Sequence, residues 1–379
     1  MGSRPALAAA VTSVAVRAGP RPYEALVGAG LLKEIGPLVR RHFRADRCAV
    51  VTDSNVAPLF GTIVCDNLRG AGFDPELIVI APGEGSKSLA QAGALCDQLS
   101  AAGLDRSSFL MSLGGGVVGD LAGFVASIYL RGIPYVSVPT TLLAQVDSCI
   151  GGKTAVNSSA GKNLIGAFHH PAIVIIDLET LRTLPERIWR EGFAEVIKHG
   201  IILDAELFNM AAQQSGFAPN DAAGWNQALP WLELLIERSL MLKAAIVAAD
   251  ERDEKGTRAL LNFGHTIGHA IESAAGYERL LHGEALSLGL VGAVHVSVRR
   301  AGLSLGEAVR IRAALGLHHL PTRLPPGFPR EKIFAALAHD KKFENSRIRF
   351  VVAHEIGRAS LSHDVTMDDL RAAVAELES

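Results

Sequence analysis

Three histidines and a glutamate are spaced in a way that could bind a metal ion. His265 and His269 are four residues apart, so a helix would project both from one face. His282 follows in LLHGE, and Glu195 in AEVIKHG is the candidate carboxylate partner. Two imidazoles and a carboxylate leave a fourth position open, as a catalytic zinc site requires. The helical pair could instead bind the metal together, and spacing alone does not separate these two sets.

A run of three glycines, Gly114 to Gly116, could bind a phosphate. The apolar run 109–113 precedes it and a second apolar run follows Asp120, which predicts a buried strand, a tight turn and the start of a helix. Glycine accepts positive φ and lets a backbone N–H approach a phosphate without a Cβ in the way. The helix N-terminus offers unpaired N–H groups and a partial positive charge to a diphosphate. Such a turn can also serve packing alone.

Several charged residues have sequence neighbours that are unusual for exposed charges whose only role is solubility. Small or apolar neighbours surround Asp120, Asp147, Lys153 and Lys162. Charges in such surroundings are typical of functional sites. Lys198 lies three residues after Glu195, so a helix would point it into the same site. The alternative for Lys198 is a surface ion pair, worth only ~0.2–0.5 kcal/mol.

The elements that position these groups alternate between strand and helix in the first half of the chain. Buried strands are predicted over residues 47–52, 76–81, 109–113, 133–139 and 173–177. This spacing favours a parallel, Rossmann-like sheet, in which ligands bind beyond the carboxyl ends of the strands. Asp53, Glu84, Lys87 and the glycine turn all fall at strand ends, so one crevice could gather them. Asp53 could equally be a helix cap.

Helical periodicity dominates the second half of the chain, for example over residues 231–249 and 259–273. We therefore predict an α/β domain over 1–184 and a mainly α-helical domain over 185–379. Within the second helix, Arg258, Asn262 and His269 would share one face. A strand-like run at 347–352 lies inside this helical domain.

Composition and charge indicate a globular protein and argue against nucleic-acid-binding and membrane-spanning proteins. The 379 residues are enough for two domains, and 49% hydrophobic with 20% charged residues is typical of a globular chain. A formal charge of −2 argues against a nucleic-acid surface. No stretch reaches the ~20 uncharged apolar residues that span a bilayer. The four cysteines form no CxxC pair, which predicts reduced thiols and a cytoplasmic location.

The longest motifs carry a resemblance. They are GGGVVGDLAGF, VPTTLLAQVDS, IGGKTAVN, GKN, AEVIKHG, LNFGHTIGHAIE and DKK. In these motifs, which extend over most of the chain, the sequence resembles the 3-dehydroquinate synthases of the shikimate pathway. The resemblance implies Glu195, His265 and His282 as ligands of one divalent metal ion, zinc or cobalt.

The same resemblance implies NAD in the crevice of the first domain. The residues that it assigns to the cofactor are Asp53, Glu84, Lys87, Gly115, Gly116, Val117, Val118, Gly119, Asp120, Thr140, Thr141, Lys153, Lys162, Thr180 and Thr183. Those that it assigns to catalysis and substrate binding are Arg131, Asp147, Lys153, Asn163, Lys198, Lys243, Arg258, Asn262, His269, Lys341 and Lys342. The segment DERDEKGTR is one residue longer than the family pattern, so either Asp253 or Glu254 could fill an expected acidic position, and neither is assigned.

The implied reaction converts 3-deoxy-D-arabino-heptulosonate 7-phosphate to 3-dehydroquinate and phosphate. It proceeds by transient oxidation with NAD, elimination of phosphate, re-reduction and intramolecular aldol closure, and a homodimer is the implied assembly. A substrate with both a phosphate and a carboxylate would account for the many cationic residues. Three alternatives are a sugar-phosphate cyclase of valiolone or inosose type, a polyol dehydrogenase that releases NADH, and an inactive NAD-binding protein.

Overall fold

The computed structural model describes residues 11–19, 22–159, 161–213, 222–276, 279–338, 343–344 and 347–378. The chain divides into two compact units, 1–183 with 229–245 and 184–228 with 246–379. The middle of helix α7 (Ala222–Ala249) thus belongs to the first unit. The predicted boundary at residue 184 stays a prediction.

The first unit is built on a seven-stranded sheet of order β1-β2-β9-β6-β5-β3-β4. Its strands are β1 (Thr12–Val16), β2 (Tyr23–Gly28), β3 (Arg47–Asp53), β4 (Asp74–Ile80), β5 (Phe109–Gly114), β6 (Tyr135–Pro139) and β9 (Ile173–Asp177). All neighbours from β2 to β4 are parallel, which confirms the predicted α/β sheet. β1 is antiparallel to β2, because the short connection between them allows only a hairpin.

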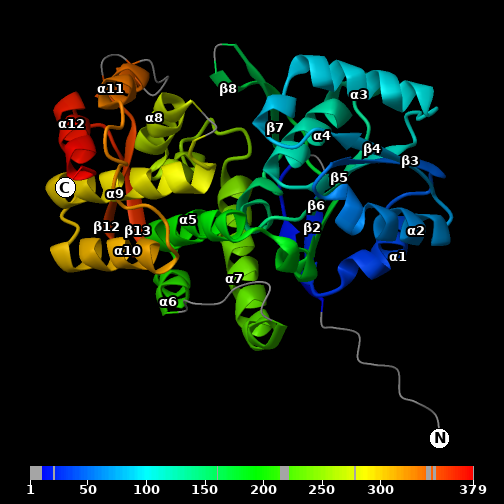
Figure 1. Cartoon of the computed structure of the whole chain (residues 1–379), viewed down its shortest axis with the longest axis horizontal. Coiled ribbons are helices and arrows are strands. Elements are labelled where there is room, and N and C mark those ends of the chain that lie inside the picture. Colours follow the sequence, from blue (N-terminus) through cyan, green and yellow to red (C-terminus); the bar gives the residue numbers. More distant parts are fainter. Residues whose placement is uncertain are drawn as a thin grey trace, which may run out of the picture. The chain divides into compact units, whose positions relative to one another are not determined.

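Helices cover both faces of this sheet (Figure 1). One face carries α1 (Ile35–Arg40) and α2 (Thr62–Gly70), and the other carries α3 (Leu89–Ala101) and α4 (Gly116–Ile128). Successive strand residues point to opposite faces, so Val50 and Met111 pack under α1 and α2 while Ala49 and Leu110 pack under α3 and α4.

A separate hairpin of β7 (Lys153–Ser158) and β8 (Gly161–Phe168) packs against α4. The approach is close: a Cβ added to Gly123 of α4 would lie 2.5 Å from the Thr154 side chain. Short helical turns complete the unit: η1 (Leu31–Glu34), η2 (Ala57–Gly61), η3 (Glu84–Ser86), η4 (Tyr129–Arg131), η5 (Ala144–Ser148) and η6 (Leu178–Thr183). The sequence analysis did not predict this hairpin, which carries Lys153, Lys162 and Asn163.

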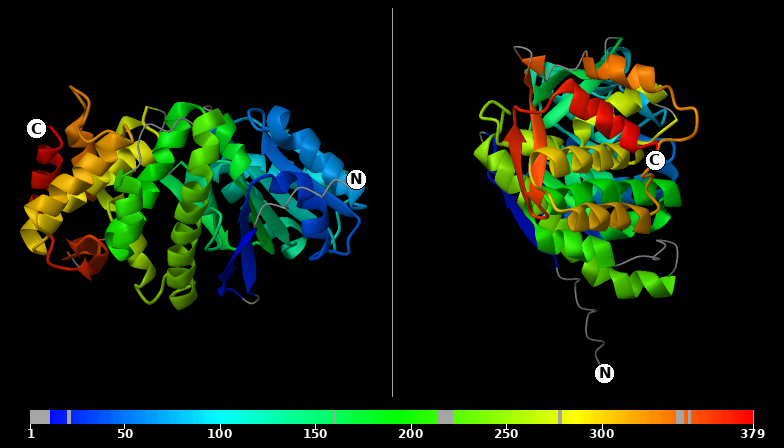
Figure 2. Two further views of the ribbon diagram at one scale, coloured as in Figure 1. Left: turned by 90° about the horizontal axis from the view of Figure 1, so that it is seen from below. Right: turned by 90° about the vertical axis from the view of Figure 1, so that its left-hand side faces the viewer.

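The second unit is mainly helical, as predicted. Its main helices are α5 (Glu186–Leu203), α6 (Ala205–Gln213), α8 (His265–Ala275), α9 (His282–Arg300), α10 (Leu305–Leu317), α11 (Arg330–Ala338) and α12 (Met367–Glu376). Helix α9 is buried along most of its length, and it packs against α5, α8, α12 and β12 (Phe350–Glu355) (Figure 2). Strand β12 pairs with β13 (Arg358–Ser362) and overlaps the strand-like run predicted at 347–352.

The continuous helix predicted over 259–273 is wrong. A 3₁₀ helix, η7 (Arg258–Asn262), ends before Gly264, whose φ of 78° lies in the left-handed region, and α8 begins at His265. Arg258 and Asn262 therefore do not share a helix face with His269. The helical periodicity of the sequence continues through Gly264, so it predicted one helix. The helix breaks there because glycine adopts positive φ at little cost.

Helices α8 and α9 meet through glycines, which brings their first residues close together. A Cβ on Gly289 would lie 2.2 Å from the Gly264 carbonyl oxygen and 2.6 Å from the Gly268 nitrogen. Because both neighbours are backbone, we expect Gly289→Ala to lower the free energy of unfolding by roughly 1–3 kcal/mol or more, measured by denaturant titration. Gly316→Ala is the control, since a Cβ there meets nothing within 4 Å. Equal losses in both variants would contradict this packing argument.

His318 makes the stability of the second unit depend on pH. Its ring stacks on Phe193 with centroids 3.9 Å apart, and its Nε2 lies 2.7 Å from the Ala211 carbonyl oxygen. Burial lowers the pKa of His318 from its usual 6.5 to about 4. The folded state thus favours the neutral ring. The His318 contribution is complete above pH 6.5 and is lost, by about 1.4 kcal/mol per pH unit, as the pH falls towards 4.

The variant His318→Gln isolates this effect, because glutamine keeps an N–H donor for Ala211 and does not titrate. We expect the stability advantage of the native protein over this variant to shrink by about 2 kcal/mol between pH 7.5 and pH 5. Urea denaturation at both pH values measures it. An advantage that stays constant over this range would rule out the proposed titration.

Candidate functional site

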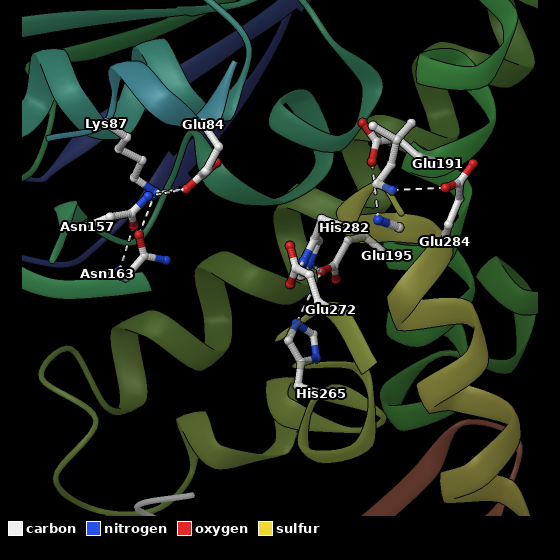
Figure 3. Close-up of polar contacts among 12 residues, drawn as sticks. Glu84, Lys87, Asn157, Asn163, Glu191, Glu195, His265, Glu272, His282 and Glu284 are labelled. Atoms are coloured by element: carbon white, nitrogen blue, oxygen red, sulfur yellow. Dashed lines mark hydrogen bonds and ion pairs between the residues drawn. The ribbon is translucent and has the colours of Figure 1, made fainter. Parts of the chain in front are cut away.

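The second unit brings Glu195, His265 and His282 together. Glu195 lies on α5, and the two histidines are the first residues of α8 and α9 (Figure 3). The Glu195 Oε1 atom is 3.4 Å from His265 Nε2 and 3.5 Å from His282 Nε2. Two consecutive helices, α8 and α9, thus converge with the distant α5 on one carboxylate oxygen.

The donor set fits a zinc ion. Zinc binds histidine nitrogen and carboxylate oxygen at about 2.0–2.1 Å, so two ligand atoms of a tetrahedral site are about 3.3–3.4 Å apart. The two separations from Glu195 Oε1 are close to that value. Three protein ligands would leave one position open, as in catalytic zinc sites. The assignment of the three as ligands stays a prediction.

Each imidazole also has an acceptor beside its other nitrogen. His265 Nδ1 lies 3.3 Å from the Phe263 carbonyl oxygen, and His282 Nδ1 lies 3.5 Å from a carboxylate oxygen of Glu272. Burial lowers the pKa of His265 and so favours the neutral, ligating form. Burial acts in the same direction on His282, but hydrogen bonds to Glu195 and Glu272 outweigh it and raise its pKa to about 10.

Lys198 forms an ion pair with the second oxygen of Glu195 inside the unit. Both side chains are only 2% exposed, so the alternative of a surface ion pair is wrong. Burial alone would raise the pKa of Glu195, yet Lys198 and the two histidines hold it well below its usual value. Glu195 is therefore ionised, which is the form that a metal ligand requires.

Successive turns of α5 dock the start of α9. Arg187 donates two hydrogen bonds to the Glu284 carboxylate, at 2.6 and 2.7 Å, and Glu191 accepts one from the Gly283 backbone N–H at 3.2 Å. A Cβ on Gly283 would lie 2.1 Å from the Glu191 carbonyl oxygen. Sequence analysis missed Glu191 and Glu272, although Glu191 is four residues before Glu195 and Glu272 seven after His265, spacings that share a helix face.

In the first unit, the glycine turn joins β5 to the N-terminus of α4. Gly115 is the N-cap, and a Cβ on it would lie 3.1 Å from the Thr141 side chain. None of Gly114, Gly115 and Gly116 has positive φ, so that part of the expectation is wrong and close approach alone explains them. Gly116, Val117, Val118, Gly119 and Asp120 form the start of α4. The N–H groups of its first turn lack helical partners, whereas the Gly119 N–H already donates to the Gly115 carbonyl oxygen.

Lys87 organises a polar network beside this turn (Figure 3). Its Nζ donates to Asp120 Oδ2 at 2.6 Å and to Asn163 Oδ1, and it lies 3.8 Å from Glu84. Asn157, which sequence analysis did not single out, donates to Glu84 and accepts from the Asn163 N–H. Burial raises the pKa of Asp120, and Lys87 opposes that rise. Residues from β8, α4 and the turn after β4 are thus tied to one lysine.

Hydroxyl groups lie beyond the carboxyl ends of β6 and β9. The buried Thr140 Oγ1 has no hydrogen-bond partner among the described residues, so it is suited to a ligand. Thr141, Thr180 and Thr183 use their hydroxyls locally, with Ala144 N, Asp177 O and Thr180 O respectively. Asp53 accepts from the Asn55 and Val56 N–H groups, so it closes the turn after β3.

A pocket in the first unit is lined by Gly115, Gly119, Asp120, Ser148 and Lys153, among others. Beside it Asp147 is held by Lys243, whose Nζ contacts Asp147 Oδ1 at 2.8 Å and Asp147 O at 2.6 Å. Lys162 is half-buried on β8. Arg131 is exposed and has a φ of 69°, a conformation that costs energy in a residue other than glycine.

The remaining candidates lie in the second unit. Arg258 is buried, and its guanidinium donates to the Glu251 carbonyl oxygen at 2.7 Å. Asp250, unnoticed in the sequence, accepts from the N–H groups of Glu254, Lys255 and Arg258, and so shapes the segment that contains Asp253 and Glu254. Asn262 is half-buried and His269 is exposed, with its ring 5.1 Å from that of His265. Lys341 and Lys342 lie outside the described residues.

Comparison with known proteins identifies the family that this chain matches. The models described as 3-dehydroquinate synthase N-terminal and 3-dehydroquinate synthase C-terminal match residues 77–191 and 192–343. A curated 3-dehydroquinate synthase of Symbiobacterium thermophilum is 48% identical over 93% of this chain and 97% of its own.

Solved structures agree on the fold. One is the 2-epi-5-epi-valiolone synthase of Streptomyces hygroscopicus subsp. jinggangensis with NAD+ and Zn2+ bound, which has a TM-score of 0.84 and 30% identity over 95% of this chain and 97% of its own. Another is a 2-deoxy-scyllo-inosose synthase complexed with carbaglucose-6-phosphate, NAD+ and Co2+, with a TM-score of 0.84 and 25% identity over 96% and 99%. Within the described residues, no helix has the length and apolar character to cross a membrane.

Proposed function

Because the chain belongs to the 3-dehydroquinate synthase family, we propose that it converts 3-deoxy-D-arabino-heptulosonate 7-phosphate to 3-dehydroquinate and phosphate. It would act as a carbon–oxygen lyase that depends on NAD and one divalent metal ion. The observation that carries the proposal is the convergence of His265 and His282 on Glu195 at the spacing of zinc ligands. The higher identity to a dehydroquinate synthase than to the valiolone and inosose enzymes favours it over those alternatives.

Glu195, His265 and His282 would hold the metal ion, which when bound supplies a Lewis acid that acidifies a substrate hydroxyl. Lys198 contributes by keeping Glu195 ionised within a buried site. The neutral form of His265, favoured by burial, leaves an imidazole lone pair for coordination.

The first unit would bind NAD, which supplies a hydride acceptor that later returns the hydride to the same substrate. The N–H groups at the start of α4 suit a diphosphate, because that helix end carries a partial positive charge. The buried Thr140 hydroxyl, which lacks a partner among the described residues, suits a polar group of the cofactor. Lys87 and Asp120 neutralise each other there, so cofactor binding need not bury an isolated charge.

The substrate carries a phosphate and a carboxylate, and cationic side chains would recognise both. Lys153 is exposed at the start of β7 and lines the pocket of the first unit. Lys243 fixes Asp147, which would hold a substrate hydroxyl. In the second unit, Arg258 would bind an anionic group, while Asn262 and His269 would act at the ring hydroxyls.

Substrate preference tests this proposal against the other cyclases. With NAD and zinc supplied, we expect dehydroquinate, identified by mass spectrometry, from the heptulosonate phosphate only. Sugar phosphates that lack the carboxylate should give no cyclised product, because the cationic side chains proposed to bind that carboxylate would have no anionic partner on the substrate. Turnover of such a sugar phosphate in preference to the heptulosonate would make the chain a cyclase of another type. We further propose that the chain is cytoplasmic and forms a homodimer. Sedimentation velocity tests the homodimer, and cell fractionation tests the location.

A further inference from the structure

The two imidazoles of the metal site share one arrangement. Each presents Nε2 to Glu195 and Nδ1 to an acceptor, which is the Phe263 carbonyl oxygen for His265 and the Glu272 carboxylate for His282. A metal-bound histidine usually donates its second ring N–H to such an acceptor, which fixes both the tautomer and the ring orientation. The acceptor of His265 is backbone and immobile, whereas that of His282 is a side chain.

Glu272 is a charged residue in an unusual place. It lies on α8, two turns after His265 and on the same face, and it is only 3% exposed. A buried carboxylate is costly unless it is paired or hydrogen-bonded. Figure 3 shows its carboxylate directed at the ring of His282.

We propose that Glu272 is the positioning residue of His282: it accepts a hydrogen bond from the Nδ1–H group and thereby directs the Nε2 lone pair at the metal. The inference rests on the proposed metal site and concerns only how that site is held. His282 needs such a partner more than His265 does, because its side chain is 32% exposed against 12% for His265. The less enclosed ring has more freedom to turn away from Glu195.

Glu272 could instead belong to a second set of metal ligands. His269, Glu272 and His282 also offer ligand atoms within 4.8 Å of one another. If Glu272 were itself a ligand, the native chain would bind two ions, with His282 shared between them through its two nitrogens. Two ions per chain would indicate that both sites bind metal, and a single ion that survives His265→Ala would indicate the second site alone.

The test is zinc affinity, measured on full-length protein by competition with a chromophoric chelator. We expect one zinc per chain in the native protein, and about 10- to 100-fold weaker binding in Glu272→Ala. Glu272→Gln should lose less, because its amide oxygen still accepts a hydrogen bond. If Glu272→Ala does not fold, Glu272→Met carries the test, because methionine is similar in size and offers no oxygen acceptor to His282. The matched control is Asp369→Asn, which removes an equally buried carboxylate, 1% exposed and paired with Arg300, and which should leave zinc affinity unchanged.

Zinc affinity within about twofold of native in Glu272→Ala, or in Glu272→Met where the alanine variant does not fold, would overturn the inference while leaving the metal site intact. Two zinc ions per native chain would also overturn it. Failure of the proposed site itself has another signature: native protein without zinc, or with zinc that survives replacement of His265.

Discussion

Replacing His265 with alanine should abolish both bound zinc and turnover. His265 Nε2 lies 3.4 Å from Glu195 Oε1, the spacing of two ligands on one zinc ion. The variant would leave two protein ligands, fewer than the three of catalytic zinc sites. We expect the zinc content to fall from about one ion per chain to near zero, measured by atomic emission after dialysis. Circular dichroism establishes whether the variant is folded.

His269→Ala is the matched control, because His269 stands one turn further along the same helix. It should retain zinc and lose turnover, since it is assigned to the substrate and not to the metal. Zinc that survives in His265→Ala and disappears in His269→Ala would contradict the proposed ligand set.

Replacing Lys153 with alanine should have the opposite signature: zinc is retained and catalysis is lost. Lys153 lies in the first unit, whereas the three proposed ligands belong to the second. Loss of one charged contact to a reacting group costs on the order of 10²–10³-fold in rate. We expect kcat/KM to fall by that factor, measured from phosphate release.

The control for this variant is Lys33→Ala, which removes an exposed lysine of the same unit that is assigned to no site. It should leave kcat/KM unchanged. Normal turnover in Lys153→Ala would show that Lys153 has no part in the reaction.

Five of the seven strands of the main sheet could be predicted because they are continuous apolar runs, whereas β1 and β2 were not predicted. The predicted run 173–177 coincides with β9, and the run 47–52 differs from β3 by one residue. The β7–β8 hairpin could not be found in this way, because β8 is partly exposed on both faces and shows no apolar face. The break between η7 and α8 depends on one left-handed glycine, which periodicity does not register.

Sequence motifs identified the charged residues that the structure brings together around Glu195 and Lys87. They did not identify Glu191 and Glu272, because a glutamate on a helix is ordinarily a surface residue. Glu272, which is buried, and Glu191, which is half-buried, are exceptions, since α8 and α5 pack the faces that carry them against α9. That burial depends on tertiary packing at Gly283 and Gly289, which no local pattern encodes.

The proposed reaction is a redox cycle that begins and ends with NAD on the same chain. The most direct test follows phosphate release from the heptulosonate phosphate and absorbance of NADH in one cuvette, with zinc and NAD supplied. This cycle predicts steady phosphate release with no accumulation of NADH. Accumulating NADH without phosphate would contradict it and indicate a dehydrogenase.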